Sequence, residues 1–275
     1  MNYILITGCS TGIGYETAKY LKEKNYNIIV TSRKQLDVKK LSNEFEHSIH
    51  LDVSSSKSIK KAYLSIKKII KKNSVYGIFC NAGYGQWGAV EDLNINLIKK
   101  QFEANIFGHI EIINLFIPHM RKQNKGRIIF NSSVLGLVSL PYCSAYNATK
   151  FAMEAFASSL RLELINTNIK VTLIEPGPIE SNFNINVLKH LKKIDINNSP
   201  HKNKYYKFMK YFKREKNKFT LPALSVAKKV YLALKSNNPK SQYYVTLPTY
   251  ILAYARLLPN PIFEKFLKLI SKQRG

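Results

Sequence analysis

Short apolar runs alternate, along most of this chain, with longer stretches whose apolar residues recur every three or four positions. Apolar runs rich in β-branched and aromatic residues, such as 3–7, 27–31 and 76–80, predict strands. The helical spacing of residues such as Ile13, Thr17 and Leu21 predicts helices between them. Strands that alternate with helices in this way predict an α/β fold, a doubly wound parallel sheet with helices on both faces.

The remaining elements follow the same alternation. No repeat or linker divides it, so we expect one domain over 1–275. We expect a third strand that ends at 50–53, further strands at 127–131, 169–174 and 243–246, and helices near 35–46, 56–72, 93–104, 106–122, 145–165 and 223–236.

Composition and motif content exclude several classes of protein. Apolar residues make up 45% and charged residues 22% of the 275 positions, which is typical of a globular protein. No apolar run reaches the roughly 18 residues of a membrane-spanning helix, and the first apolar stretch lacks the basic lead of a secretory signal. The three cysteines form no CxxC pair and the six histidines show no metal-ligand spacing. We therefore expect reduced thiols in the cytoplasm and no metal site.

The net charge of +26, from 43 basic and 17 acidic residues, is unusual. A field of that strength attracts nucleic acid, anionic lipid or acidic proteins. Lysine, asparagine and isoleucine are, however, abundant along the whole length, so we interpret most of the charge as compositional background. Nucleic acid is therefore not an expected partner, whereas peripheral membrane contact through basic amphipathic helices stays open.

A glycine-rich loop joins the first predicted strand to the first helix. Gly8, Gly12 and Gly14 let the backbone turn tightly and approach a pyrophosphate, and the following helix presents free N–H groups to the anion. In an alternating α/β fold such a loop predicts a dinucleotide site of the Rossmann type. Three further loop residues are expected to contact the cofactor: Ser10, Thr11 and Ile13.

The end of the second strand indicates which dinucleotide is bound. An NAD site usually has an acid there for the ribose 2′-hydroxyl, whereas NADP requires a cation for the 2′-phosphate. Here the strand ends Thr31-Ser32-Arg33-Lys34 without an acid, and the Arg33 guanidinium can form a forked pair with a phosphate. The sequence therefore predicts NADP(H), against the alternative of a solvated basic turn.

Tyr146 and Lys150 are four positions apart on the helix predicted over 145–165, so both side chains emerge on one face. A free tyrosine has a pKa of about 10, and a nearby ammonium lowers that pKa because it stabilises the phenolate. Such a pair can give a proton to a carbonyl oxygen when a hydride reaches the carbon. Ser132 and Ser133 lie at the end of the fifth strand, where doubly wound sheets bind ligands, and a hydroxyl there can hydrogen-bond the same oxygen.

The order of these motifs resembles that of the short-chain dehydrogenase/reductase family over nearly the whole length. Within that family the chain is similar to a bacterial subgroup related to retinol dehydrogenases, 17β-hydroxysteroid dehydrogenases and NADP-dependent aldehyde reductases. Ser181 stands where the family often has a threonine near the nicotinamide, and it keeps the hydroxyl. The matching pieces are the TGxxxGIG loop, Asp52, Asn81-Ala82-Gly83, Asn105, Ser133, the YxxxK pair of Tyr146 and Lys150, and Pro176-Gly177.

The resemblance implies a role for each matching residue. Tyr146 would donate the proton, Ser133 would position the substrate carbonyl, and both would contact the substrate. Lys150 would hold the nicotinamide ribose and lower the pKa of Tyr146, while Asn105 would anchor a water relay toward Lys150. The resemblance also implies further cofactor contacts. Asp52 and Val53 would border the adenine, and Asn81 and Ala82, with Gly83, the adenosine. Pro176, Gly177 and Ile179 would lie at the nicotinamide carboxamide.

Residues 182–220 are polar, basic and aromatic without a predicted strand, and the resemblance assigns substrate choice to this segment as a lid. Tyr205, Phe208, Met209 and Phe212 have the spacing of one helix face. That face fits a lid over an apolar pocket, a helix on a membrane surface or an ordinary packed helix. The C-terminal extension 248–275 predicts two short helices separated at 259–261, which either cap the pocket or pack against a second subunit.

We expect an NADPH-dependent oxidoreductase, a dimer or tetramer, that transfers a hydride between the nicotinamide and a lipophilic aldehyde, ketone or secondary alcohol. A 3-oxoacyl-(acyl carrier protein) reductase is a rival interpretation, since an acidic carrier would suit a basic surface, but the long tail and lid argue against it. A non-catalytic NADPH sensor or nucleic-acid-binding protein on the same fold is a third. The complete set of Asn105, Ser133, Tyr146 and Lys150 argues against that one, because a sensor does not need a proton relay.

Overall fold

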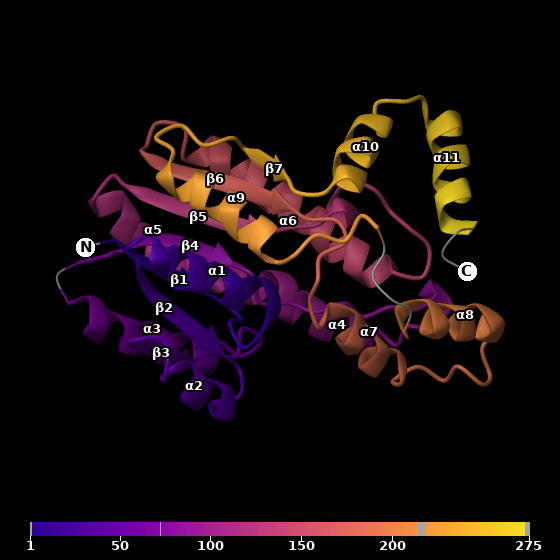
Figure 1. Ribbon diagram of the computed structural model, residues 1–275, viewed down its shortest axis with the longest axis horizontal. Coiled ribbons are helices and arrows are strands. Elements are labelled where there is room, and N and C mark those ends of the chain that lie inside the picture. The colour runs from indigo at the N-terminus through magenta and orange to yellow at the C-terminus, as the bar shows by residue number, and fades with distance from the viewer. Residues whose placement is uncertain (1, 72, 214–217, 273–275) are drawn as a thin grey trace.

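The computed structural model describes residues 2–71, 73–213 and 218–272, and within them seven parallel strands form one sheet (Figure 1). The strand order is β3-β2-β1-β4-β5-β6-β7, so the chain starts near the middle and winds outward in both directions. This is the doubly wound arrangement that the alternating pattern predicts. The strands are β1 (Tyr3–Ile6), β2 (Asn27–Ser32), β3 (His47–His50), β4 (Val75–Cys80), β5 (Gly126–Asn131), β6 (Ile169–Glu175) and β7 (Gln242–Tyr244).

Helices cover both faces of the sheet, as the near-continuous apolar strands require. Residues of α3, α5 and α6 share one buried cluster with Leu5 and Ile78 of the sheet. Residues of α1, α2 and α9 share another with Ile4 and Phe79, which point to the opposite face. The covering helices are α1 (Gly12–Glu23), α2 (Gln35–Leu41), α3 (Ser56–Ile70), α5 (Gly108–Lys122), α6 (Ser144–Glu163) and α9 (Leu224–Lys235).

Several boundaries differ from the predicted ones, most by one or two residues. The third strand ends at His50 rather than at 53, because the chain turns at Asp52, whose carbonyl and carboxylate accept the N–H groups of Ser55 and Ser54 at 3.1 and 2.9 Å. The helix predicted over 35–46 ends at Leu41. The last strand, predicted over 243–246, is β7 (Gln242–Tyr244), because Thr246 already serves as the N-cap residue of α10 (Leu247–Ala255).

The two helices predicted over 93–104 and 106–122 form one continuous helical segment. α4 (Ile95–Phe102) passes through a π-helical turn, Glu103–Phe107, directly into α5. Such turns are frequent at functional sites, and Asn105 lies in the middle of this one. Gly108, at the start of α5, has no room for a side chain, because a Cβ atom there would lie 1.7 Å from the carbonyl oxygen of Val53.

The helices of the predicted lid and tail lie beyond the carboxyl ends of the strands (Figure 1). They are α7 (Phe183–Leu191), α8 (Lys202–Lys213), α10 and α11 (Asn260–Lys272). The predicted apolar face of α8 packs into a third cluster, in which Tyr205 and Trp87 are buried and against which Met209 and Phe212 pack; Phe208 is buried beside Trp87. The apolar side of α11 packs against the same cluster, so both helices are joined to the body through it.

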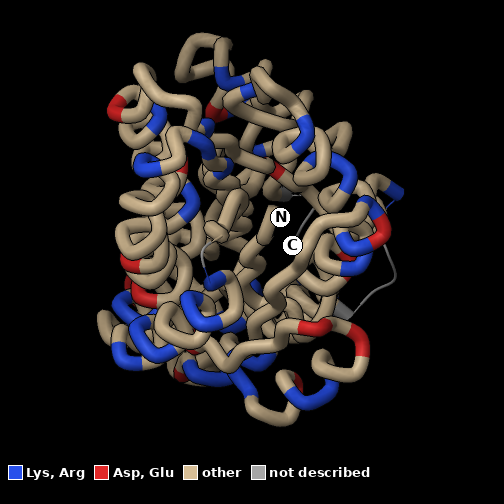
Figure 2. The backbone as a smooth tube through the Cα atoms, turned by 90° about the vertical axis from the view of Figure 1, so that its left-hand side faces the viewer, with Lys and Arg blue, Asp and Glu red and all other residues tan. Residues whose placement is uncertain are grey.

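Basic residues are distributed widely over the molecule. In the view of Figure 2, Lys and Arg lie on helices and loops around the whole outline, with the few acidic residues scattered among them. This distribution fits the interpretation of the +26 charge as background. Within the described ranges no helix has the length and apolar composition needed to cross a membrane.

Candidate active site

A cavity of about 570 Å³ opens at the carboxyl ends of β4, β5 and β6. This is the edge at which doubly wound sheets bind ligands. The predicted residues that line it are Ile13, Asn81, Gly83, Ser133, Tyr146, Lys150, Pro176, Gly177 and Ile179. The predicted residues outside its lining are Gly8, Ser10, Thr11, Gly12, Gly14, Arg33, Asp52, Val53, Ala82 and Asn105.

Tyr146 lies in the first turn of α6 and is almost completely buried, with its ring 5.4 Å from that of Phe183. Burial raises the pKa of the Tyr146 phenol, and a side-chain hydrogen bond with Ser133 acts in the opposite direction. A raised pKa keeps the phenol protonated at neutral pH. Tyr146 thus lines the cavity in its protonated form.

Ser133 follows β5 and caps the short helix Val134–Gly136, because its hydroxyl accepts the N–H of Leu135 at 3.1 Å. Ser132 also lines the cavity, but its hydroxyl donates to the carboxylate of Glu154. Of the two serines, Ser133 is thus the one paired with Tyr146. Ser133 is also the serine that the family resemblance selects.

Lys150 lies one helical turn after Tyr146, and its ammonium is 5.6 Å from the centre of the tyrosine ring. Its Nζ donates a hydrogen bond of 2.6 Å to the carbonyl oxygen of Asn131 at the end of β5. Burial lowers the pKa of Lys150 to about 8, while the negative charge of Glu154 acts in the opposite direction. That Lys150 lowers the pKa of Tyr146 stays a prediction.

Two carboxyl groups, the half-buried Glu154 and the buried Glu175, lie close to residues that line the cavity, and sequence reasoning missed both. Glu154 follows Lys150 by one turn and accepts hydrogen bonds from Ser132 and, at 3.4 Å, from Gln242. Glu175 ends β6 and is fully buried, with no hydrogen-bond partner found for either carboxyl oxygen. Burial raises the pKa of both groups, and for Glu175 the charge of Glu154 raises it further. The spacing of four from Lys150 was the only signal in the sequence.

Asn105 lies in the π-helical turn behind the cavity, where its side chain is fully engaged. Its amide donates to the carbonyl of Tyr84 at 3.0 Å and to the hydroxyl of Thr149 at 3.1 Å, and its oxygen accepts the N–H of Tyr84. These bonds leave the backbone carbonyl as the group for the implied water relay. That carbonyl already accepts a 3.2 Å hydrogen bond from Nδ1 of His109, and the relay stays a prediction.

His109 joins this turn to the glycine loop, a role that its sequence context did not suggest. Because a carbonyl oxygen only accepts, Nδ1 carries the proton, and Nε2 can accept from the hydroxyl of Thr7 at 3.2 Å. The Thr7 oxygen in turn accepts the N–H groups of Asn81 and Ala82 at 2.9 Å. Burial lowers the pKa of His109 to about 4, so the ring is neutral.

The glycine loop has the features that a dinucleotide pyrophosphate requires. Gly8 and Gly12 adopt positive φ angles of 73° and 64°, which favour glycine. A Cβ atom on Gly14 would lie 2.3 Å from the carbonyl oxygen of Gly8. Thr11 caps α1 without a side-chain hydrogen bond, and the first turn holds no acidic residue. The helix N-terminus therefore keeps its N–H groups and its positive end for an anion.

Asn81 fixes the loop from the end of β4. Its amide nitrogen donates to the carbonyl oxygens of Thr7 and Gly8 at 2.9 and 3.2 Å, and its oxygen accepts from the amide of Asn131 at 2.9 Å. Ala82 lies so close that a Cβ on Gly8 would be 2.9 Å from its Cα atom. The Asn-Ala-Gly motif thus positions the loop as well as bordering the cavity.

Arg33 directly follows β2, and Asp52 and Val53 lie two and three positions after β3. Arg33 is exposed; burial raises the pKa of Tyr84, which lines the cavity, and the Arg33 charge acts in the opposite direction. Asp52 holds the turn before α3, and the Val53 side chain is buried in the core. The acid near this edge is Asp37 of α2, which accepts a long 3.5 Å hydrogen bond from Ser32.

Part of the cavity wall is apolar and aromatic. Trp87 and Phe212 line it 4.8 Å apart in an edge-to-face contact, beside Phe183, Val134 and Leu135. The sequence predicted the Phe212 face of α8 but gave no reason to select Trp87. In the described part of the chain, no three His, Cys, Asp or Glu side chains are grouped so that they could hold a metal ion.

The chain is similar over its whole length to several curated proteins. It is 36% identical to the uncharacterized oxidoreductase YbbO of Escherichia coli (strain K12), over 96% of this chain and 93% of that protein. Human 17-beta-hydroxysteroid dehydrogenase type 1 is 29% identical over 88% of this chain and 77% of its own length. The NADPH-dependent 3-dehydrocapnine reductase of Ornithobacterium rhinotracheale is 28% identical, over 99% and 98%.

Solved structures share the fold. A short-chain dehydrogenase/reductase from Burkholderia phymatum in complex with NAD is similar with a TM-score of 0.78, at 21% identity, over 93% of this chain and 92% of that one. The family profile described as short chain dehydrogenase matches residues 2–192. The resemblance read from the motifs is thereby confirmed, and the chain belongs to the short-chain dehydrogenase/reductase family of oxidoreductases, which act on small molecules with a nicotinamide cofactor.

Proposed function

We propose that this protein is an NADPH-dependent carbonyl reductase for lipophilic aldehydes or ketones, with Tyr146 as the proton donor. One observation carries the proposal: the phenol of Tyr146, paired with Ser133, lines the same cavity as Lys150, next to an aromatic wall. Proton donor, oxygen-binding hydroxyl and cation are the groups that carbonyl reduction needs at one carbon centre.

The cofactor supplies the hydride when it is bound, and the protein controls the proton and the position of the carbonyl. Ser133 donates a hydrogen bond to the carbonyl oxygen as negative charge develops on it. Tyr146 gives its proton to that oxygen, and its raised pKa ensures that the proton is present at neutral pH. The charge of Lys150 then stabilises the phenolate that remains. Asn105 would hold the water through which the proton is replaced.

A preference for NADP(H) is supported by the exposed Arg33 directly after β2, since a guanidinium pairs well with a 2′-phosphate. A relative whose name states NADPH dependence supports it further. Asp37, near the same edge, is the residue that would favour NAD if it turned toward the ribose. Arg33 directly follows the carboxyl end of β2, whereas Asp37 lies on α2, so we favour Arg33 as the residue that contacts the ribose.

A lipophilic substrate is supported by the aromatic and aliphatic wall of the cavity, where Trp87, Phe183 and Phe212 lie beside Val134 and Leu135. Burial of such side chains against an apolar ligand contributes roughly 25 cal/mol per Å². The reacting groups Ser133 and Tyr146 line the same cavity, and the Tyr146 ring lies 5.4 Å from that of Phe183. A substrate with a carbonyl beside an apolar body therefore suits this lining.

The direct test follows NADPH oxidation with a panel of aliphatic and aromatic aldehydes and ketones. We expect turnover by the wild type and a decrease in kcat of about 10²-fold or more in Tyr146→Phe, the usual size of a general acid's contribution. Tyr63→Phe, on α3, removes a hydroxyl that bonds His119 far from the cavity and serves as the control. Equal rates in wild type and Tyr146→Phe would contradict the proposal.

We also infer a homo-oligomer, a dimer or tetramer. The support is the exposure of Leu162 and Ile165 around the end of α6, which are 67% and 68% exposed. Light scattering of the purified protein measures the mass directly. A monomer at all concentrations would contradict this inference.

Peripheral membrane contact is a further part of the proposal. Ile251 and Tyr254 of α10 and the following Leu257 are exposed, next to Arg256, which is a composition that suits an anionic bilayer surface. Flotation with vesicles of anionic and of neutral lipid tests it. The three cysteines are free and buried, which supports the proposed location in the reducing cytoplasm.

A further inference from the structure

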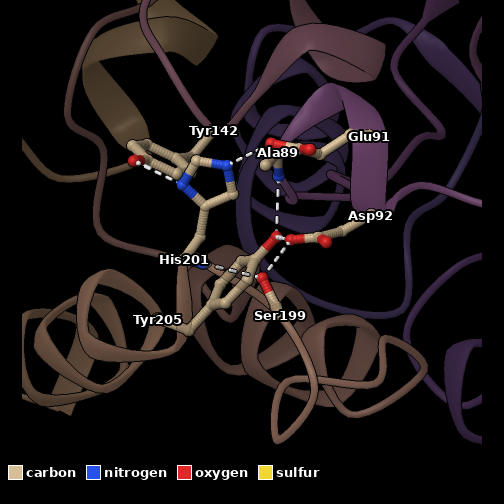
Figure 3. A network of polar contacts seen from close by, with 7 residues as sticks. All are labelled: Ala89, Glu91, Asp92, Tyr142, Ser199, His201 and Tyr205. Carbon is tan, nitrogen blue, oxygen red and sulfur yellow. Dashed lines mark hydrogen bonds and ion pairs between the residues drawn. The ribbon is translucent and has the colours of Figure 1, made fainter.

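The start of α8 is tied to the loop after β4 by a compact set of hydrogen bonds (Figure 3). The Tyr205 hydroxyl donates to Oδ2 of Asp92 at 2.6 Å, and the Ser199 hydroxyl donates to the same oxygen at 2.6 Å. The N–H of Ala89 donates to the Tyr205 oxygen at 2.8 Å. We call these four residues the latch. It joins two segments that lie more than a hundred positions apart in sequence.

The latch is buried and charge-assisted, which makes its hydrogen bonds strong. Tyr205 is fully buried, Ser199 is nearly so, and Asp92 is half-buried. Hydrogen bonds to a carboxylate are about twice as strong as neutral ones, and an unpaired buried group costs about 1–3 kcal/mol. Opening the latch would leave the Tyr205 hydroxyl and the Ala89 N–H without these partners. The closed position of α8 is therefore well defined.

A second layer of contacts surrounds the latch. Nε2 of His201 donates to Glu91 at 2.6 Å, Nδ1 lies 3.2 Å from the Tyr142 hydroxyl, and the His201 N–H donates to Ser199 at 2.9 Å (Figure 3). The Glu91 side chain is 65% exposed, and ion pairs at such positions contribute little, about 0–1 kcal/mol. Asp92, rather than Glu91, is thus the main anchor.

The latch is continuous with the aromatic wall of the cavity. Trp87 lies two residues before Ala89, and its indole contacts Phe208 and Phe212 at centroid distances of 6.1 and 4.8 Å. Both phenylalanines lie on the same face of α8 as Tyr205, three and seven positions further along. When the latch fixes Tyr205, it also fixes the rotation of α8 and hence how far Phe212 reaches over the cavity.

We propose that Asp92 is a specificity-determining residue: by holding Tyr205 it keeps Phe208 and Phe212 against Trp87, so that the aromatic wall selects substrates by their bulk. The proposal rests on the carbonyl reductase function proposed above. With the latch closed, the wall is rigid. The kcat/KM for bulky aldehydes then differs strongly from that for slender aldehydes. Without the latch, α8 can move away from Trp87, and the difference in kcat/KM between the two kinds of aldehyde becomes smaller.

The chain supplies matched controls for both partners. Tyr205→Phe removes the latch hydroxyl, whereas Tyr206→Phe removes the hydroxyl of the exposed neighbour, which donates only to Asn197. Asp92→Asn removes the latch charge, whereas Asp195→Asn removes the charge of an acid that bonds Asn198 within the lid region. Each control removes the same chemical group as its latch variant, a tyrosine hydroxyl or an aspartate charge, from a residue of the lid region outside the latch.

The first measurement needs no turnover. Trp87 is the single tryptophan of the chain, so its quenching by acrylamide reports the exposure of the wall. We expect the quenching constant to increase at least about twofold in Tyr205→Phe and Asp92→Asn and to stay at the wild-type value in both controls. Unchanged quenching in both latch variants would overturn the proposal.

The second measurement compares kcat/KM for 4-tert-butylbenzaldehyde and for propanal with NADPH. Shape discrimination in apolar pockets reaches about 10–200-fold, and we expect the ratio to move at least about fivefold toward one in the latch variants only. A ratio that stays constant while quenching increases would also overturn the proposal. A wild type that reduces neither aldehyde contradicts the reductase function alone. In that case the Kd of each aldehyde is measured from the quenching of Trp87 fluorescence as the aldehyde binds. A Kd ratio that moves toward one in the latch variants only supports the role of Asp92, and an unchanged ratio overturns it.

Discussion

The Nζ atom of Lys150 lies 2.6 Å from the carbonyl oxygen of Asn131 and points away from bulk water, one helical turn behind Tyr146. Burial lowers the pKa of this lysine to about 8, and Glu154 acts in the opposite direction. At neutral pH the lysine thus carries its charge, but its pKa lies much closer to neutral pH than that of a free lysine. In the proposed reaction, this pKa sets the upper limit of the pH range for turnover.

The pH dependence of carbonyl reduction is the first prediction. Above about pH 8 Lys150 loses its proton and can no longer stabilise the phenolate of Tyr146, so kcat/KM should fall by about tenfold per pH unit. In Glu154→Gln the lysine loses the charge that favours its protonated form, so the decline should start at a lower pH. Glu163→Gln, an exposed position on the same helix, is the control. A decline at the same pH in all three proteins would contradict the role of Glu154.

Cofactor preference is the second prediction. Arg33→Asp removes the cation for the 2′-phosphate and adds a charge that repels it, so the Kd for NADPH should rise by at least about 10-fold while that for NADH changes little. Isothermal titration measures both. Lys34→Asp makes the same charge change one residue further along. Equal losses in both variants would show a general effect of charge rather than a contact with Arg33.

The stability of the protein should decline with rising pH because of Glu175. Burial raises the pKa of this carboxyl in the folded protein above its value in the unfolded chain. Between those two values the folded state holds a proton that the unfolded state has released, so folding stability is greatest below the unfolded pKa and is lost as the pH rises. In Glu175→Gln the free energy of unfolding should fall less between pH 5 and pH 9, by about 1–3 kcal/mol. The decline in Tm over the same range should be correspondingly smaller. An unchanged slope, measured beside Glu23→Gln, would show that Glu175 is not the group responsible.

His109 should have the opposite pH signature. Burial lowers its pKa to about 4, whereas the unfolded chain binds the proton near pH 6.5, so stability is present above 6.5 and is lost as the pH falls toward 4. The loss can reach about 3 kcal/mol. His109→Phe should be less stable at pH 7 by about 1–3 kcal/mol, because Thr7 and Asn105 lose their partner, and should lose less on acidification. His119→Phe is the matched control.

The sheet and the centre of the site were predictable from local patterns. Strands such as β1 and β4 are short apolar runs between amphipathic helices, so their positions follow from periodicity. The glycine loop, Tyr146 and Lys150 were predictable because each motif lies next to a strand end or on one helix face, and Ser133 was selected through the family resemblance. Strand ends were less certain: Leu51 and Val53 suggest that β3 continues, but hydrogen bonds of Asp52 turn the chain there.

The parts that sequence did not predict depend on contacts between distant segments. Asp92 and Tyr205 are 113 positions apart, and nothing near either residue indicates the other. His109 has the spacing of an ordinary helix residue, and only the fold brings it between Thr7 and Asn105. Glu175 precedes a recognisable Pro-Gly motif, but its burial against Glu154 follows from the packing of β6 on α6.

The missing side chain at Gly108 brings two backbone segments into direct contact. The backbone of α5 lies against the carbonyl of Val53, so no flexible group separates the turn after β3 from the π-helical turn that holds Asn105. A displacement of one segment is therefore passed on to the other. Any larger residue at this position would force the two segments apart, because no side-chain rotation can relieve a Cβ atom 1.7 Å from the Val53 oxygen.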